Sequence, residues 1–482
     1  MARCSGGGVY LKQISVLFIC VAFLAGCHQT EETADIGEIY GEVATAVGEN
    51  RNPVIVIPGI LGTKLESVDG TKVWGSFTFG AADADFADGA RLVALPMERG
   101  RSLSVLRDDV VPTSVLDVVV ADVGLFRGIE IGAYVEILKT LAAGRYRDQS
   151  MGDAGIVDYG GLHYTCFQFA YDWRRDIAES AVLLDELVRD AQQASRVGRR
   201  LSDHAHVKVD VVAHSMGGLV LRYYLRYGIQ PLPDDGTLPE LTWAGARNIE
   251  HAILIGTPNA GSVLSFQQLV DGWDLGPLFP NYRSSVLGTM PAIYQLLPRT
   301  RHGRVIDEST GSPIDIFDAD EWIRREWGLA DPRQDFKLQQ LLPDVPTFEE
   351  RRAIAIDHLR KALARASQLH KSLDVPASPP LTTRVSLFAA DSRATPAKVG
   401  VDAQHRIEII ENTPGDGTVT RRSAVMDERV GREFTPRLES PIAWDRVQFL
   451  FTDHIGLTRD AAFVDNVLYM LLEDPRSWAA TR

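Results

Sequence analysis

The chain has 482 residues, of which 45% are hydrophobic and 24% are charged, and its formal net charge is −14 at pH 7. This balance excludes a wholly disordered, collagenous or coiled-coil protein, and the length allows two or three domains or one large domain with insertions. The negative charge disfavours nucleic-acid binding and gives no general attraction to anionic lipid headgroups, so contact with a membrane would need an anchor or a local apolar patch.

The first residues have the features of a targeting segment. Arg3 and Lys12 precede an apolar run, Ile14 to Leu24, which is short for a transmembrane helix. The run ends in Leu-Ala-Gly-Cys27. This tetrapeptide resembles the bacterial lipobox, in which the signal is cleaved before a cysteine that then carries diacylglycerol. We therefore expect a signal peptide over 1–26 and a lipid anchor at Cys27.

The residues after the anchor are acidic, and we expect 27–50 to form a lipidated tether. The expected location is a bacterial cell envelope. His28 rather than Asp follows the anchor, which favours the outer membrane where there are two membranes. Three of the four cysteines lie at or before Cys27, so no disulfide framework is possible. Cys166 lies in an apolar stretch and is expected to be a buried thiol.

From residue 52 onward, predicted strands alternate with predicted helices. A β-branched run at 53–57 precedes a Pro-Gly turn at 58–62, which is typical of a buried parallel strand. This alternation favours a mostly parallel central sheet with helices on both faces. Further strands are predicted at 163–169, 207–212, 252–255, 384–389 and 407–410, and helices at 131–144, 176–199, 216–226 and 460–472.

Two long segments interrupt the alternation. Residues 72–130 are interpreted as a lid-like excursion. Residues 262–380 contain several prolines and a charged helix near 348–370 but no clear strand, and they are interpreted as an inserted cap. The core is therefore predicted in two parts, over 51–261 and over 381–482.

The most informative motif is Ala-His-Ser215-Met-Gly, a variant of G-x-S-x-G. The bare pattern arises often by chance, but here an apolar strand ends directly before Ser215 and a helix begins directly after it. Small residues at 213 and 217 suit the tight turn of a nucleophile elbow, and the helix N-terminus favours negative charge there. We predict Ser215 as a nucleophile; the alternative is an ordinary strand-to-helix turn with a capping serine.

A serine nucleophile needs a base, an acid and an oxyanion hole. In α/β-hydrolases the acid and then the histidine follow the serine along the chain. His454, on a loop before the last predicted helix, is the predicted base. Asp416, between two glycines after the strand at 407–410, is the predicted acid, with Asp391 as the alternative. The backbone N–H groups of Leu61 and Met216 are predicted to form the oxyanion hole.

Five segments together resemble the lecithin:cholesterol acyltransferase family, which includes the group XV lysosomal phospholipase and phospholipid:diacylglycerol acyltransferase. They follow in the family's order across most of the chain. They are the Pro-Gly-Ile-Leu-Gly segment within 53–65, Tyr-Asp-Trp-Arg at 171–174, the Ser215 motif at 213–218, residues 290–298, and Gly-Asp-Gly-Thr-Val at 415–419 with His454.

The resemblance implies an α/β-hydrolase core with a cap and membrane-binding elements. It also implies acyl transfer from a glycerolipid ester through an acyl-serine, with Ser215, Asp416 and His454 as the catalytic residues. By the same resemblance, Trp74 belongs to the lid, and Trp74 and Asp172 are candidate substrate-binding residues. The chemistry needs no cofactor and no metal.

Two departures leave the acyl acceptor open. The disulfide that closes the lid of animal members cannot form here, and residues 256–262 resemble bacterial triacylglycerol lipases. The expected partners are a lipid ester donor, either a phospholipid or an acylglycerol, and for a transferase a lipid alcohol acceptor. The alternatives are a carboxylesterase or triacylglycerol lipase without transferase activity, and a non-catalytic surface-binding lipoprotein. The sequence leaves the oligomeric state undetermined.

Overall fold

The computed structural model describes residues 35–77, 81–116, 120–123, 126–127, 134–274, 280–430 and 435–475. The predicted signal peptide and the predicted anchor, Cys27, lie outside these residues. Among the described residues, no helix has both the length and the apolar character needed to cross a membrane.

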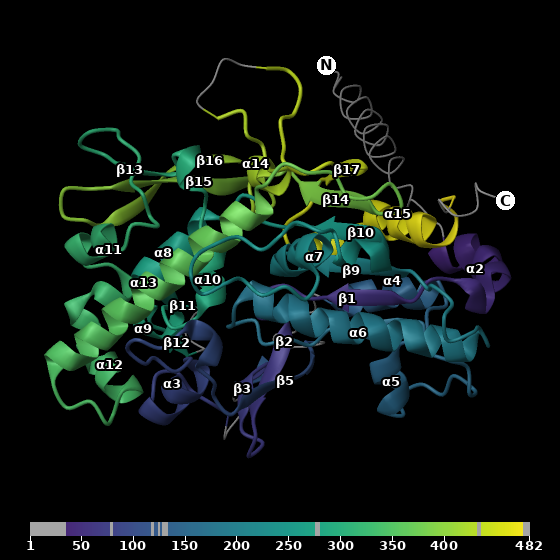
Figure 1. Cartoon of the computed structure of the whole chain (residues 1–482), viewed down its shortest axis with the longest axis horizontal. Coiled ribbons are helices and arrows are strands. Elements are labelled where there is room, and N and C mark those ends of the chain that lie inside the picture. The colour runs from purple at the N-terminus through teal and green to yellow at the C-terminus, as the bar shows by residue number, and fades with distance from the viewer. Residues whose placement is uncertain are drawn as a thin grey trace, which may run out of the picture.

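The centre of the fold is a six-stranded sheet in which every neighbouring pair of strands is parallel (Figure 1). All residues of its three middle strands are buried, as expected where helices cover both faces of a sheet. The predicted parallel sheet is therefore confirmed. Its strands are, in spatial order, β17 (Arg446–Leu450), β14 (Arg384–Ala390), β10 (Ile249–Ile255), β9 (Val209–His214), β1 (Val54–Ile57) and β8 (Cys166–Gln168).

Alternate side chains of the central strands enter two separate hydrophobic clusters, one on each face. On one face, Ile55 and Val211 pack with α6 (Ile177–Gly198) and α7 (Met216–Tyr227). On the other face, Val56 and Val212 pack with three further helices. Those helices are α2 (Ile36–Val47), α4 (Val135–Ala143) and α15 (Ala461–Leu472).

Part of the predicted tether belongs to the folded body. Helix α2 begins at Ile36 and is capped by Asp35, and its Tyr40 and Ala44 are buried. The Tyr40 hydroxyl donates to the Asp465 carboxylate at 2.7 Å, which fixes α2 to α15 (Figure 1). The acidic residues of this segment hid an apolar face at helical spacing, so the tether prediction for 36–47 was wrong.

The predicted excursion over 72–130 contains a small antiparallel sheet and a short helix, α3 (Ala87–Val93). The sheet has the order β3-β2-β5 and is formed by β2 (Thr63–Ser67), β3 (Lys72–Trp74) and β5 (Val110–Val115). Three more strand segments of this region are β4 (Ser76–Phe77), β6 (Val120–Val123) and β7 (Phe126–Arg127).

The predicted cap over 262–380 is mainly helical among its described residues. The charged helix predicted near 348–370 is α13 (Phe348–Leu373), which crosses the whole cap in Figure 1. The shorter helices are α8 (Val263–Asp271), α9 (Ser284–Leu287), α10 (Pro291–Gln295), α11 (Ala319–Arg325) and α12 (Asp335–Leu341), and short strands are β11 (Trp273–Asp274), β12 (Asn281–Tyr282) and β13 (Val305–Asp307).

The strand predicted at 407–410 exists but lies outside the central sheet. It is part of β16 (Ile407–Gly415), which pairs antiparallel with β15 (Arg393–Val401). Strand β13 of the cap pairs with β15, so the cap and this hairpin share one three-stranded sheet. Exposed and partly buried residues alternate along β16, which is typical of an antiparallel hairpin with one face towards solvent.

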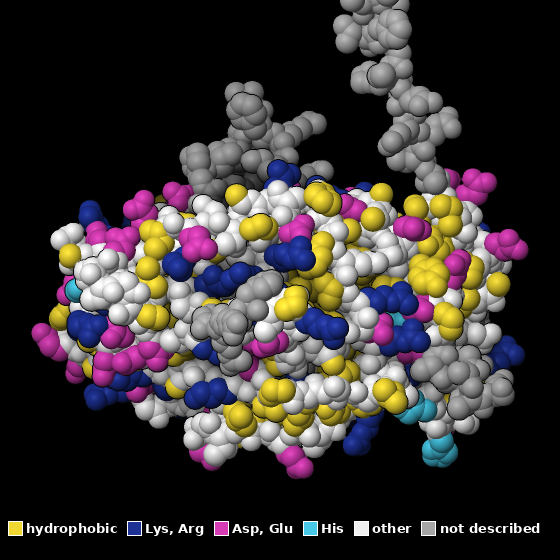
Figure 2. Space-filling view, turned by 90° about the horizontal axis from the view of Figure 1, so that it is seen from above, with side chains coloured by type: hydrophobic (Ala, Val, Ile, Leu, Met, Phe, Trp, Pro, Cys, Tyr) yellow, Lys and Arg dark blue, Asp and Glu magenta, His cyan; other side chains and the backbone are white. Residues whose placement is uncertain are grey.

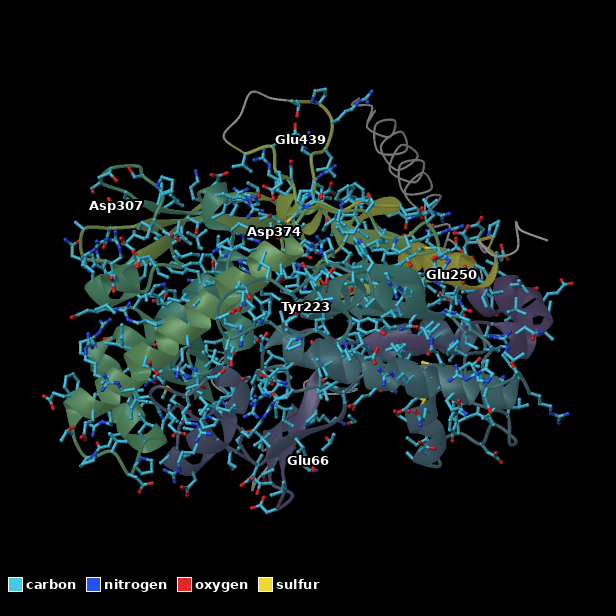
Figure 3. The ribbon with its side chains drawn as sticks, viewed as in Figure 1. Glu66, Tyr223, Glu250, Asp307, Asp374 and Glu439 are labelled. Atoms are coloured by element: carbon cyan, nitrogen blue, oxygen red, sulfur yellow. The ribbon has the colours of Figure 1, made fainter. Side chains whose placement is uncertain are left out.

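The end of α13 is fixed by ion pairs to one carboxylate, that of Asp374. Asp374, which Figure 3 labels just after this helix, lies 3.0 Å from the Arg299 guanidinium and 2.8 Å from that of Arg301. Burial raises the pKa of Asp374, but the two arginines outweigh burial and hold the pKa well below its ordinary value. The carboxylate therefore stays ionised and joins the cap helix to the segment that follows α10.

Cys166 is buried at the start of β8, as predicted. Its thiol donates to the Asp148 carboxylate at 3.3 Å, and Asp148 also caps α5 (Gln149–Asp153). Burial raises the pKa of the Cys166 thiol well above its ordinary value, so the group is an unreactive structural thiol.

The negative net charge is not spread as one uniform field. Figure 2 shows basic, acidic and apolar side chains interspersed over the face that it presents. Local composition, more than net charge, therefore governs what this face can contact.

Candidate active site

Ser215 occupies a strained turn between β9 and α7. Its φ is 53° and its ψ is −125°, a conformation that a residue with a side chain rarely adopts. The turn is crowded: a Cβ on Gly217 would lie 2.4 Å from the Pro58 carbonyl oxygen, and a Cβ on Gly59 would lie 2.7 Å from the Ser215 Cβ. Only glycine fits at either position, which is the packing expected of a nucleophile elbow.

Ser215, His454 and Asp416 are hydrogen-bonded in series. The Ser215 Oγ lies 3.0 Å from Nε2 of His454, and Nδ1 of His454 lies 2.7 Å from Oδ2 of Asp416. Ser215 follows β9, His454 follows β17 by a short loop, and Asp416 follows β16. The structure thus brings together the three side chains that the sequence selected from distant positions.

The Asp416 carboxylate is held as an anion inside the protein. The side chain is 2% exposed, and its Oδ1 accepts hydrogen bonds from the amides of Thr418 and Val419 at 2.9 and 2.6 Å. Burial raises the pKa of Asp416, but His454 and these amides outweigh burial, so the pKa lies below its ordinary value. An ionised carboxylate at Nδ1 orients the imidazole and leaves Nε2 free to accept a proton from serine.

Asp391, the alternative acid, has a different partner. Its carboxylate pairs with the guanidinium of Arg421, at the start of α14 (Arg421–Ala424). Asp416 therefore takes the place opposite His454, and Asp391 serves a surface ion pair.

The turn at 58–62 is fixed beside Ser215 by aromatic side chains. The Tyr171 hydroxyl donates to the Pro58 carbonyl at 2.8 Å, and Nε1 of Trp74 donates to the Leu61 carbonyl at 2.7 Å. The amide of Gly62 closes the turn on the Gly59 carbonyl at 3.1 Å, with Leu61 at a φ of 65°. These bonds fix the turn that contains Leu61, and Gly59 of the same turn lies against Ser215. That the N–H groups of Leu61 and Met216 form the oxyanion hole stays a prediction.

Trp74 and Asp172 are both buried, at 6% and 7% exposure. Besides binding Leu61, Trp74 packs edge-on against Trp173. Asp172 forms an ion pair with Arg174 at 2.8 Å. Contact of either residue with substrate stays a prediction, whereas their contacts with neighbouring protein groups are seen directly.

The Tyr-Asp-Trp-Arg motif joins the excursion to the core. Arg174 is fully buried, and it binds Asp172 and Asp108 at 2.8 Å each. It also donates to the carbonyls of Leu92 and Val93 at the end of α3. Burial lowers the pKa of Arg174, but the two carboxylates outweigh burial and raise it overall. The described part of the excursion is therefore bound to the core at this point.

Two buried neighbours of Ser215 were not predicted as part of the site. Tyr134 immediately precedes α4, and His214 is the last residue of β9; they are 4% and 2% exposed. A single polar side chain within an apolar run does not change the hydrophobic pattern of the sequence. Only the tertiary structure therefore shows that Tyr134 and His214 lie at the site. Among the described residues, no group of three or more His, Cys, Asp or Glu side chains could hold a metal ion.

Comparisons with known proteins find a family match over part of the chain and a solved structure of similar fold. Residues 149–321 match the family model for lecithin:cholesterol acyltransferase. One chain of the Tle4-Tli4 complex superposes with a TM-score of 0.56 at 16% identity, covering 88% of this chain and 98% of that one. The Bacillus licheniformis lipase BlEst2 in mature form covers 88% of this chain and 92% of its own at 12% identity, with a TM-score of 0.31. No curated protein gives a significant match.

The sheet, the strained serine turn and the structural match define an α/β-hydrolase. The match of residues 149–321 to the lecithin:cholesterol acyltransferase family model agrees with the resemblance that the motifs indicated.

Proposed function

We propose that the protein is a serine acyl hydrolase or O-acyltransferase that acts on glycerolipid esters through an acyl-serine intermediate. The observation that carries the proposal is the hydrogen-bonded series Ser215–His454–Asp416 beside the turn at 58–62. The family match supports a lipid-acting enzyme of this general kind.

In the first half of the reaction, Nε2 of His454 takes the proton of Ser215 as the serine oxygen attacks the ester carbonyl carbon. Negative charge develops on the carbonyl oxygen, where the N–H groups of Leu61 and Met216 would stabilise it; one such donor contributes about 3–4 kcal/mol. His454 then gives the proton to the leaving alcohol, and the acyl group remains on Ser215. Asp416 keeps the imidazole oriented and stabilises its charged form.

In the second half, a hydroxyl compound attacks the acyl-serine. Water gives a free fatty acid, and a lipid alcohol gives a new ester. The same three side chains act in either case, with His454 removing a proton from the attacking oxygen. The reactions differ in the acceptor, so a carboxylesterase or triacylglycerol lipase is the second candidate function. A non-catalytic surface-binding lipoprotein is disfavoured, because the hydrogen-bonded series is complete.

We place the enzyme at the bacterial cell envelope, held by lipid on Cys27. The apolar run before Leu-Ala-Gly-Cys27 supports this. Only residues 28–34 separate Cys27 from the described fold, and this stretch spans at most about 30 Å. A lipid anchor at Cys27 would therefore keep the folded body close to the membrane that contains its substrate.

The test uses the chain without residues 1–27 and phosphatidylcholine vesicles, with and without a sterol or diacylglycerol. Free fatty acid and acylated alcohol are measured together, and Ser215→Ala is the control. Acylated alcohol formed at the expense of fatty acid identifies a transferase, and fatty acid alone identifies a phospholipase. If neither wild type nor Ser215→Ala releases either product, both proteins are assayed next with short-chain esters. Absence of Ser215-dependent turnover of those esters would contradict the proposal.

A further inference from the structure

Tyr134 and His214 form a hydrogen-bonded pair that the mechanism above does not use. The Tyr134 hydroxyl lies 3.3 Å from Nδ1 of His214, and their rings meet edge to face with centroids 5.8 Å apart. Both side chains are buried next to Ser215. Burying two polar groups costs free energy unless each finds its partners, so their bonding pattern needs a complete account.

The neighbouring backbone groups fix the direction of every bond in this pair. The amide of Gly59 donates to the Tyr134 oxygen at 2.7 Å, and Nε2 of His214 lies 3.1 Å from the carbonyl oxygen of His454. A carbonyl only accepts, so Nε2 must carry the hydrogen. A neutral imidazole then has a lone pair at Nδ1, which accepts the proton of the Tyr134 hydroxyl.

The surroundings keep the two groups in these protonation states. Burial, and after it the nearby His454 ring, 4.8 Å away between centroids, lower the pKa of His214 to about 3. The bond to the His454 backbone and the charge of Asp416 act in the opposite direction but are outweighed. Burial also raises the pKa of the Tyr134 hydroxyl far above its ordinary value. His214 is therefore neutral and Tyr134 protonated wherever a serine esterase works.

The resulting chain of bonds joins the two loops that face Ser215. It begins at Gly59, in the turn at 58–62, and ends at the backbone of His454. The amide of His454 donates to the Asp416 carbonyl at 2.9 Å, so the backbone of the base is held on both sides. Movement of either loop would break a buried bond, and a misplacement of about 1 Å at such a site costs roughly a hundredfold in rate.

We propose that Tyr134 and His214 are positioning residues that hold the turn at 58–62 and the loop of His454 in a fixed relation to Ser215. This proposal rests on the proposed function. The hydrogen bonds of the pair go to the backbone of Gly59 and of His454, not to the Ser215 hydroxyl or the His454 imidazole, so we expect an effect on the rate of the chemical step and not on binding of the ester. Residues that only filled space would be replaceable by apolar groups of similar volume.

Matched substitutions separate positioning from packing. His214→Gln places an amide N–H near the position of Nε2 and keeps a donor for the His454 carbonyl, whereas His214→Leu fills the space without a donor. Tyr134→Phe removes only the hydroxyl. The full chain in detergent micelles is assayed with a p-nitrophenyl ester, with Ser215→Ala as the blank and thermal unfolding as the control for folding.

We expect kcat to fall about a hundredfold in His214→Leu and about tenfold in Tyr134→Phe with KM little changed, and to stay within about fivefold of wild type in His214→Gln. Equal kcat values in Gln and Leu variants, or an unchanged kcat in Tyr134→Phe, would overturn the proposal. Tyr134→Phe decides the question if His214→Leu does not fold.

Nitrogen-15 spectra of labelled histidine test the chain without any activity. His214, His358 and His370 each place Nε2 at a backbone carbonyl, so the His214 signals are identified as those lost in His214→Gln. We expect His214 to carry its hydrogen on Nε2, not to titrate between pH 5 and 8, and to show an Nδ1 signal that shifts in Tyr134→Phe. A titrating His214, or one with the hydrogen on Nδ1, contradicts the bond chain. If wild type itself lacks Ser215-dependent turnover, the proposed function fails, and these spectra still show whether the chain of bonds exists.

Discussion

Asp416 and His454 are joined twice: Oδ2 of Asp416 lies 2.7 Å from Nδ1 of His454, and the Asp416 carbonyl accepts the His454 amide at 2.9 Å. The side-chain bond sets which nitrogen of the imidazole carries hydrogen. The backbone bond fixes the position of the His454 main chain, from which the imidazole extends. Together they aim Nε2 at the Ser215 hydroxyl, 3.0 Å away.

We expect Asp416→Asn to lower kcat by about four orders of magnitude, because an amide at this place favours the wrong imidazole tautomer and cannot stabilise the imidazolium. Steady-state turnover of a p-nitrophenyl ester measures the change. Asp391→Asn is the matched control, because Asp391 pairs with Arg421 and not with His454. An equal loss in both variants would contradict the assignment of Asp416.

Trp74→Phe tests the turn at 58–62. The substitution keeps an aromatic ring but removes the Nε1–H that holds the Leu61 carbonyl at 2.7 Å. Because the Leu61 peptide then loses its anchor, we expect kcat to fall about tenfold with little change in KM, which is less than the loss of a whole oxyanion donor. Trp173→Phe, which loses a bond to the Thr63 carbonyl, serves as the comparison. Unchanged kcat in Trp74→Phe would show that the Leu61 peptide needs no such support.

Local patterns made part of the site predictable. Ser215 was found because a buried strand, a tight turn with small residues and a helix follow one another within a few positions. Asp416 and His454 were found from their order along the chain and from the glycines around the acid. Each of these signals lies within a short stretch of sequence, where backbone geometry limits the residues that fit.

Features that depend on tertiary contacts were not predictable. Helix α2 follows an acidic stretch, and the burial of its apolar face depends on distant contacts such as that of Tyr40 with α15. Strand β17 is at the edge of the sheet and only partly buried, so it lacks a clear apolar run. The partners of Tyr134 come from the turn at Gly59 and the end of β9, which are far from it in sequence.

We expect Arg174→Met to lower the free energy of unfolding by about 3–5 kcal/mol, because it leaves the buried Asp172 and the partly buried Asp108 without their cation. Denaturant titration measures the loss, and limited proteolysis between α3 and β5 reports release of the excursion. Arg91→Met removes the exposed pair with Asp88 and should cost less than about 1 kcal/mol. Similar losses in the two variants would mean that the Arg174 network adds nothing beyond a surface ion pair.

The ion pairs around Arg301 predict a loss of stability in acid. Burial raises the pKa of Glu428, but bonds from His302 and Arg301 outweigh burial and lower the pKa from 4.5 to about 2 in the folded protein. A depressed folded pKa gives stability that is present above the unfolded pKa and is lost as the pH falls from about 4.5 towards 2. In Glu428→Gln, we expect the melting temperature to be lower at pH 7 and to change less over this range. If the melting temperatures of wild type and Glu428→Gln fall by the same amount from pH 5 to 3, Glu428 is not the origin of the acid sensitivity.

Phe451 tests whether the rim of the site meets a lipid surface. This side chain is 86% exposed and lies between β17 and His454, at the carboxyl edge of the sheet. Because burying an aromatic ring in a bilayer surface stabilises binding, we expect Phe451→Ser to lower the rate on phosphatidylcholine vesicles several-fold but to leave the rate on a soluble p-nitrophenyl ester unchanged. Leu381 is 98% exposed and precedes β14, at the amino edge of the same sheet, so Leu381→Ser is the matched control. Equal rates on vesicles for Phe451→Ser and wild type would mean that the lipid reaches Ser215 without contact at this rim.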